Sequence, residues 1–268
     1  MLFGEFAKSQ AEAEYPELWN GLVGAWSPCL SPRGGTILRD LSGKGNHGTL
    51  TNMDPATDWV LSGGRPALDF DGSNDYVNLE RRVLDDVASA CTINAWVATT
   101  AAASVYRTVF TQVGPGTNTS NTMYLYNGTV CFHHFPPGGG NLETTATLND
   151  GLLHMATVGF RAGRRAAAID GNVKSADATP ETYSGVASTA WTIGATSAGT
   201  LFRYLGQIHE VLVWDSFNEA LWPLLYRLGP GGWATPRRRR WNYVTAQTAI
   251  PYWVFARKNA RLIGGGVS

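Results

Sequence analysis

The sequence predicts an all-β sandwich, because short apolar segments alternate with turn residues along most of its 268 positions. Its 31 glycines and 13 prolines follow no fixed period, and they suit many short strands joined by turns. Hydrophobic residues make up 44% of the chain and charged residues only 16%, so a large core can be buried. Asn127-Gly128 and Asp170-Gly171 lie between strand-like segments and are typical of tight β-hairpins.

The first expected element is a helix over residues 5–19, rich in good helix formers and anchored by Phe6, Leu18 and Trp19. A first strand follows at residues 21–26. The further expected strands are residues 66–70, 75–79, 92–98, 105–112, 122–127, 129–134, 152–160, 165–170, 190–194 and 203–214. A short helix over residues 218–227 comes last, and Pro223 limits its length.

Five segments carry a family resemblance. Residues 39–50 (RDLSGKGNHGTL) and 67–79 (ALDFDGSNDYVNL) are turns rich in Gly, Asn and Asp between short strands. Residues 91–97 (CTINAWV), 191–195 (WTIGA) and 206–214 (GQIHEVLVW) follow in order. Together they resemble the laminin-G-like, concanavalin A-like jelly-roll family over residues 20–228. The resemblance implies a concanavalin A-like jelly-roll sandwich with a short N-terminal helix and an extended C-terminal arm.

The two ends of the chain differ in charge although the formal net charge is zero. Residues 1–20 hold four glutamates against one lysine, and residues 220–268 hold seven arginines and one lysine without any acidic residue. The sequence therefore predicts three parts: an acidic helical arm at 1–20, a jelly-roll domain at 21–228, and a basic aromatic arm at 229–268.

Cysteine usage and hydropathy indicate the expected compartment. The chain has an odd number of cysteines, Cys29, Cys91 and Cys131, and no two of them form a C-x-x-C motif. We therefore expect free buried thiols in a reducing environment. The first residues lack a basic segment followed by an apolar one, so no signal peptide is expected. No apolar run is long enough to span a membrane.

Catalytic motifs are missing. Glycosidases on this fold place carboxylates on one strand face as E-x-D-x-x-E, and the sequence has no such motif. Glu210 and Asp215 are five residues apart and would point to opposite faces of a strand. His133 and His134 would also face opposite ways, so they would not share a metal ion. We therefore expect no catalytic residues and no enzyme activity.

A structural calcium ion is the one cofactor that the resemblance implies. Many family members bind calcium near the glycine-rich turns, where oxygen ligands gather. The corresponding candidates are Asp40, Asn46, Asp71 and Asp75. His209 stands where the family has an aspartate, which departs from the pattern. The alternative is that these four side chains cap their own turns.

Aromatic and basic residues are the candidates for recognition. Exposed rings on a loop rim would bind sugars, and the candidates are Trp59, Tyr106, Tyr126 and Tyr183. The C-terminal arm offers a partner-binding set of Arg237, Arg238, Arg239, Arg240, Trp241, Tyr243 and Trp253. The alternative for the arginine run is a solvated, charged surface.

Strand 208–214 is apolar on both faces. Ile208, Glu210, Leu212 and Trp214 would share one face, and His209, Val211 and Val213 the other. One face can serve the sandwich core, so the other must be covered by something else. We expect the aromatic C-terminal arm to cover it, from this chain or a neighbour.

These observations predict a non-catalytic structural and recognition protein within a larger, homo-oligomeric assembly. Such jelly rolls resemble domains of phage particles, which implies a capsid decoration, head fibre or tail protein located in the virion and assembled in the host cytoplasm. Its partners would be its own subunits, a major capsid or tail protein and a cell-surface glycan; nucleic acid and membranes are disfavoured. A stand-alone carbohydrate-binding lectin and a polysaccharide-degrading enzyme stay open as alternatives.

Overall fold

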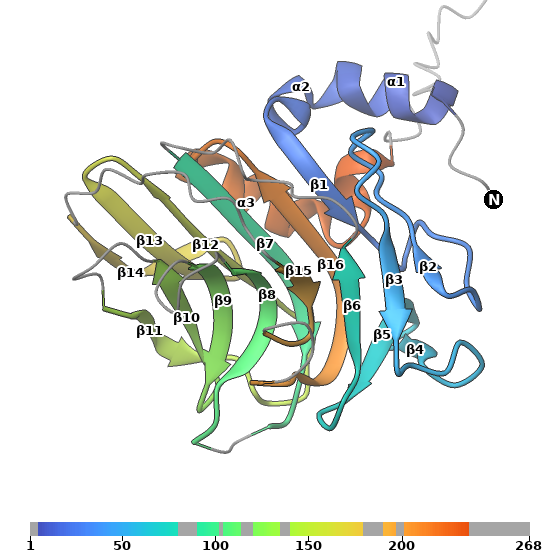
Figure 1. The fold of residues 1–268 in the computed structure, drawn as a ribbon. Helices are drawn as coiled ribbons and strands as arrows, with labels where there is room; N and C mark the ends of the chain where they lie inside the picture. The colour runs from blue at the N-terminus through green and yellow to red at the C-terminus, as the bar shows by residue number, and fades with distance from the viewer. Residues whose placement is uncertain are drawn as a thin grey trace, which may run out of the picture. The chain divides into compact units, whose positions relative to one another are not determined.

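The chain folds into two antiparallel sheets packed face to face (Figure 1). The computed structural model describes residues 5–79, 90–101, 104–113, 120–134, 140–178, 190–196 and 201–235. Within these residues, the first sheet, sheet A, has the order β14 (Asn172–Asp177), β13 (Arg164–Ile169), β12 (His154–Arg161), β7 (Ala90–Ala98), β16 (Leu205–Trp214), β5 (Arg65–Asp71) and β4 (Trp59–Ser62), with β1 (Leu22–Trp26) also paired to β16.

The second sheet, sheet B, forms the other layer of the sandwich. Its order is β11 (Leu142–Thr147), β10 (Thr129–His134), β9 (Ser120–Tyr126), β8 (Arg107–Val113), β15 (Ala190–Ile193), β6 (Tyr76–Leu79), β3 (Gly48–Thr51) and β2 (Ile37–Leu38). Every strand expected from the sequence is present, and the all-β prediction is confirmed. The strands β2, β3 and β4 were not predicted because they have at most four residues each, and β11 was not predicted because it is rich in threonine.

Both predicted hairpins are present. Asn127 and Gly128 have φ angles of 50° and 82°, and Asp170 and Gly171 have 54° and 75°. Two successive positive φ angles define the turn whose twist matches that of paired strands, and Asn, Asp and Gly tolerate it best. These turns join β9 to β10 and β13 to β14, so they set which residues of those strands face outward.

The main core lies between the two sheets. It takes one side of most strands and includes Trp26, Phe70, Phe110, Phe132 and Trp191, all at most 2% exposed. Burying aromatic side chains of this size contributes about 2–3 kcal/mol each. The side chains on the opposite strand faces point away from this core.

A second apolar cluster covers the outer face of sheet A. Leu212 and Trp214 of β16 pack there with Leu18, Leu225 and Trp233. These partners come from the helices α2 (Pro16–Trp19) and α3 (Trp222–Leu228) and the 3₁₀ turn η2 (Gly232–Ala234). Tyr15, which follows the helix α1 (Glu5–Glu14), also belongs to the cluster. The outer face is therefore covered by segments of the same chain. The part of the C-terminal arm beyond Thr235 lies outside the described residues.

The predicted faces of β16 need one correction. The pairing of β16 with β7 shifts register between Ile208 and Glu210, which is a β-bulge. Ile208 consequently lies in the main core with Val211 and Val213, and not with Glu210, Leu212 and Trp214 as an uninterrupted alternation would have it. A bulge adds one residue, and sequence alternation alone does not reveal it.

The predicted helices are both present with altered limits. The helix expected over 5–19 is broken at Tyr15 because Pro16 begins a new turn, so α1 and α2 are separate. Pro223 lies in the first turn of α3, where its missing N–H is not needed, so it begins this helix instead of limiting it.

The contacts divide the chain after Thr235, into residues 1–235 and 236–268. The predicted boundaries at residues 20 and 228 stay predictions, although the Nε1 of Trp214 donates to the carbonyl of Leu18 at 2.8 Å and so ties α2 to the sandwich. In the described part of the chain, no helix is both long and apolar enough to cross a bilayer.

Candidate functional site

Four aromatic rings gather on the outer face of sheet B and form what we call the aromatic cluster: Tyr106, Tyr124, Tyr126 and Phe202. Met123 and Leu125 of β9 point into the core, so the alternation of the strand turns Tyr124 and Tyr126 outward. Tyr106 lies immediately before β8, which pairs with β9. Phe202 precedes β16, and its carbonyl accepts from the N–H of Thr108 at 2.7 Å.

The rings contact one another closely. Tyr106 stacks on Tyr126 with centroids 4.6 Å apart and an interplanar angle of 29°. It meets Tyr124 at 5.3 Å and the ring of Phe202 edge-on at 5.7 Å. The three tyrosines are only partly buried, and Phe202 is 40% exposed. The cluster therefore offers aromatic surface to a ligand, held in place by its own ring contacts.

Polar side chains border the cluster. Asn141 donates from Nδ2 to the hydroxyl oxygen of Tyr106 at 3.0 Å, and its Oδ1 lies 2.8 Å from Nδ1 of His133. The ring of His133 also meets that of Tyr124 at 6.3 Å. An amide, an imidazole and a phenol hydroxyl are thus linked beside the stacked rings. Such a mixture of apolar faces and placed polar groups is typical of small-molecule sites.

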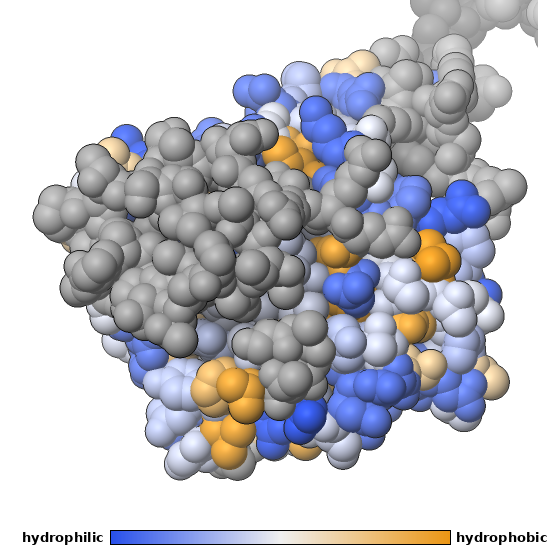
Figure 2. Space-filling model, viewed as in Figure 1, coloured by the Kyte–Doolittle hydropathy of each residue, from blue (hydrophilic) through white to orange (hydrophobic). Residues whose placement is uncertain are grey.

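Phe202 has a strained backbone, with a φ of 49°. A bulky residue other than glycine rarely adopts a positive φ, and such strain costs about 1–3 kcal/mol. Leu201 beside it is 54% exposed, and Val105 beside Tyr106 is 44% exposed. Figure 2 shows apolar side chains at the lower end of this face, where Figure 1 places the ends of β8 and β9. Strain and exposed apolar surface coincide at the cluster.

The acidity of the tyrosines follows from their surroundings. Burial raises the pKa of Tyr106, and the nearby Cys131 and Glu143 raise it further, whereas the hydrogen bond from Asn141 lowers it. Burial also raises the pKa of Tyr124. Both phenols therefore stay neutral at physiological pH and can donate hydrogen bonds.

The other sugar-binding candidates lie elsewhere. Trp59 is only 8% exposed and donates from Nε1 to the carbonyl of Gly35 at 2.8 Å. It lines a shallow hollow together with Arg33 and Asp54. Tyr183 lies outside the described residues. Of the four candidates, the structure brings together Tyr106 and Tyr126.

Asp40 and Asn46 tie their turn to β1. The carboxylate of Asp40 accepts from the backbone N–H groups of Ala25 at 3.0 Å, Ser42 at 2.9 Å and Asn46 at 2.9 Å, and from the hydroxyl of Ser42 at 2.8 Å. Asn46 donates to the carbonyl of Val23 at 2.8 Å. Donor hydrogens thus point at the oxygens that a cation would need.

Asp71 and Asp75 form a separate turn. Asp71 accepts from the N–H groups of Ser73 at 2.7 Å and Asn74 at 3.2 Å, and Asp75 accepts from the N–H of Asp71 at 3.0 Å. In the described residues, no group of three or more His, Cys, Asp or Glu side chains is arranged to hold a metal ion. The hydrogen bonds have the form of the turn-capping alternative, and calcium binding at these four residues stays a prediction.

Glu210 is buried beneath the segment that follows α3. Its Oε2 accepts from the N–H of Gly231 at 2.7 Å and from Nε1 of Trp233 at 3.0 Å. Burial raises the pKa of Glu210 to about 7. Asp215, which the sequence places on the other face, is exposed. Glu210 therefore fastens the chain after α3 to sheet A.

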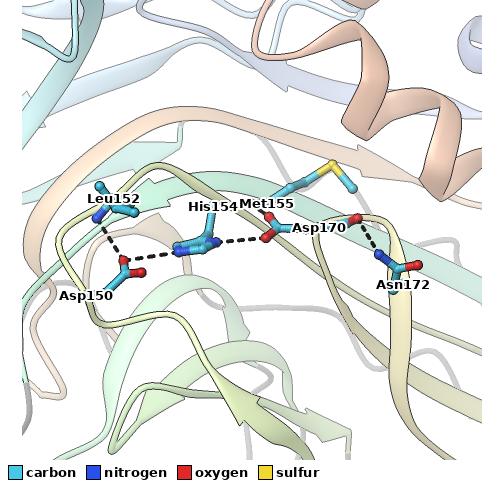
Figure 3. Close-up of polar contacts among 6 residues, drawn as sticks. All are labelled: Asp150, Leu152, His154, Met155, Asp170 and Asn172. Carbon is cyan, nitrogen blue, oxygen red and sulfur yellow. Dashed lines mark hydrogen bonds and ion pairs between the residues drawn. The ribbon is translucent and has the colours of Figure 1, made fainter.

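A histidine held between two carboxylates lies at the start of β12 (Figure 3). His154 places Nδ1 2.8 Å from Oδ2 of Asp170 and Nε2 3.1 Å from Oδ1 of Asp150. Asp170 also accepts from the N–H of Met155 at 2.9 Å. Through Asp170 this network joins β12 to the β13–β14 turn.

We expect His154→Gln to destabilise the fold by about 1–2 kcal/mol at pH 5.5 and by less at pH 9. Burial lowers the pKa of His154, but the hydrogen bonds and charges of Asp170 and Asp150 outweigh it and raise the pKa above 6.5. A raised folded-state pKa gives stability that is present at low pH and is lost as pH rises through that pKa. Urea unfolding at both pH values measures this; an equal loss at pH 5.5 and pH 9 would contradict it.

The predicted partner-binding residues all lie outside the described residues. They are Arg237, Arg238, Arg239, Arg240, Trp241, Tyr243 and Trp253. Their role stays a prediction. The three cysteines are free, as expected, but only Cys91 and Cys131 are buried, and Cys29 is partly exposed. Burial still raises the pKa of Cys29 to about 11.

Comparison with known proteins places this geometry in a family. The Laminin G model of the concanavalin A-like lectin/glucanases superfamily matches residues 71–220, which is more than half of the chain. The chain belongs to this superfamily. The predicted concanavalin A-like jelly roll is thereby confirmed, and the chain is a lectin-like jelly-roll protein. No curated protein matches the sequence significantly.

Solved structures with the same fold are distant in sequence. A Trypanosoma rangeli sialidase superposes with a TM-score of 0.58 at 11% identity, over 83% of this chain and 38% of the sialidase. The binding domains of a botulinum neurotoxin serotype D/C and of Paraclostridial Mosquitocidal Protein 1 give TM-scores of 0.55 and 0.57 at 10% and 11% identity, over 78% of this chain and 52% of each of theirs. At these identities the likeness shows the fold alone. The chain spans well under two thirds of each of these structures.

Sequence reasoning missed half of the aromatic cluster. Tyr124 could have been found, because the Asn127-Gly128 turn and the apolar Met123 and Leu125 already place Tyr124 and Tyr126 on one outward face. Phe202 and Asn141 carry no such signal. They reach the cluster from segments far along the chain.

Proposed function

We propose that this protein is a non-catalytic carbohydrate-binding domain whose sugar site is the aromatic cluster. The observation that carries the proposal is the stacked, partly exposed pair of Tyr106 and Tyr126, with Asn141 bonded to the hydroxyl of Tyr106. The apolar face of a sugar ring packs on aromatic rings, and amides and hydroxyls select its hydroxyl groups. The lectin/glucanase superfamily supports the ligand class.

One of the solved structures supports the same ligand class as analogy. It is a T. rangeli sialidase in complex with sialic acid, and two others are titled as binding domains. Fold likeness alone does not carry a function, so the site must carry it.

The proposal of a non-enzyme follows from the charges at the cluster. Glycoside hydrolysis commonly uses two carboxylates that flank the scissile bond. Glu143 is the carboxylate whose charge acts on Tyr106. The buried Glu210 is engaged by Gly231 and Trp233 on the other sheet. Release of reducing sugar from a polysaccharide panel would favour the alternative of a polysaccharide-degrading enzyme.

A glycan array probed with the full chain tests the proposal, followed by titration of Tyr106→Ala with the best ligand. We expect the substitution to weaken binding about tenfold or more, because it removes the ring that stacks on Tyr126 and the hydroxyl that Asn141 contacts. Tyr226→Ala is the matched control, since Tyr226 is a 42% exposed tyrosine stacked on Trp96 at 5.7 Å on sheet A. No array binding, or equal affinities for the two variants, would refute the proposal.

Attachment to a phage particle stays a separate proposal. It depends on residues 236–268, whose charge and aromatic content favour a partner surface. A chain lacking residues 236–268 should then lose particle binding or oligomerisation while keeping glycan binding. Size-exclusion chromatography with light scattering would detect the change, and an unaltered assembly would rule out this role.

A further inference from the structure

Arg165 of β13 is a buried cation that reaches from sheet A towards sheet B. It is 5% exposed. Its Nε and Nη2 donate to the two carboxylate oxygens of Asp177 on β14, at 3.0 Å and 2.6 Å. Its Nη1 donates to the carbonyl of Gly140 at 2.8 Å. One guanidinium therefore joins the edge of sheet A to the segment that enters β11.

Gly140 directly precedes Asn141, which binds the hydroxyl of Tyr106 and the ring of His133. The ladder between β10 and β11 begins where Phe132 pairs with Leu142, so residues 140 and 141 lie just outside it. A Cβ built on Gly140 would meet nothing within 4 Å. Among the described residues, the bond from Arg165 therefore holds the backbone of this segment outside the sheet ladder, and the bonds to Tyr106 and His133 hold the side chain of Asn141.

We propose that Arg165 is a positioning residue for the sugar site: by holding the carbonyl of Gly140, it places Asn141 between Tyr106 and His133. The inference rests on the proposed function for its effect on ligand binding. Its structural step, from Arg165 to Asn141, stands on the contacts alone.

The chemistry of arginine suits this role. A planar guanidinium can bind a carboxylate with two N–H groups and still offer a third in a fixed direction. The two hydrogen bonds to Asp177 thus fix the orientation of the guanidinium group, and Nη1 points at the carbonyl of Gly140. Lysine keeps the positive charge but presents a single ammonium group, which cannot span both partners in the same geometry.

Arg165→Lys is the test, with Arg164→Lys as matched control. Arg164 is the next residue in the same strand and also makes a two-point contact, with Glu219 at 2.6 Å and 3.0 Å, but it does not touch Gly140. Amide and aromatic NMR spectra of the full chain report on the side chain of Asn141 and the ring of Tyr106. Titration with the best array glycan gives the affinity.

We expect Arg165→Lys to shift the Asn141 and Tyr106 resonances and to weaken binding about fivefold to tenfold, the size of one well-placed hydrogen bond. Arg164→Lys should change neither. Unshifted resonances in Arg165→Lys, or equal shifts in both variants, overturn the positioning role. If the wild-type chain binds no glycan, the proposed function fails, and the resonances still decide whether Arg165 places Asn141.

Discussion

Trp233→Ala should lower the free energy of unfolding by about 3–5 kcal/mol. Trp233 is 1% exposed and packs against Trp19, with ring centroids 4.7 Å apart. Its truncation opens a cavity between η2 and α2. It also removes one of the two hydrogen bonds that Oε2 of Glu210 accepts. Glu210 is buried, so water does not replace the lost donor. Urea unfolding followed by far-ultraviolet circular dichroism measures the loss.

Trp233→Phe separates the two causes. Phenylalanine fills most of the same volume but has no N–H for Glu210, so about 1–2 kcal/mol of the loss should persist. A Trp233→Ala protein within 1 kcal/mol of wild type would show that the segment after α3 is not held as the structure has it.

Asp40→Ala should cost about 3–5 kcal/mol. The side chain is 7% exposed and accepts four hydrogen bonds, three of them from backbone N–H groups. Hydrogen bonds to a charged acceptor are worth about 1.5–3 kcal/mol each, and buried donors without a partner add to the loss. Thermal unfolding measures this loss as a lower Tm. We expect a single transition, because the turn at residues 40–48 and β1 unfold together with the rest of the fold.

Asp71→Ala is the matched control for Asp40→Ala. Asp71 also caps a turn through two backbone N–H groups but is exposed, so water replaces it and the loss should be about 1 kcal/mol. Equal losses would contradict the role assigned to Asp40. Repeating the melts with added calcium tests the calcium prediction: an increase in Tm for wild type that Asp40→Ala lacks would support it, and no increase would refute it.

The strands and hairpins could be predicted from the sequence because their determinants are local. Alternation within β9 and the glycine turn at Asn127-Gly128 fix a hairpin without any distant contact. The bulge between Ile208 and Glu210 could not be predicted, since it arises from how β16 pairs with β7. The cluster was half predictable for the same reason: Tyr126 follows from its strand, whereas Phe202 and Asn141 arrive through long-range packing.

The position of β16 in sheet A has a consequence for how the protein is made. Among the described residues β16 is the last strand along the chain, yet it lies between β7 and β5 and also pairs with β1. A chain that emerges from the ribosome from its N-terminus can form the β9–β10 hairpin early. The strands β1, β5 and β7, in contrast, cannot pair with β16 until residues 205–214 have been synthesised. Pairings between such distant segments form slowly, and their open edges invite aggregation meanwhile. A nascent chain halted before Trp214 should therefore depend on chaperones for its solubility.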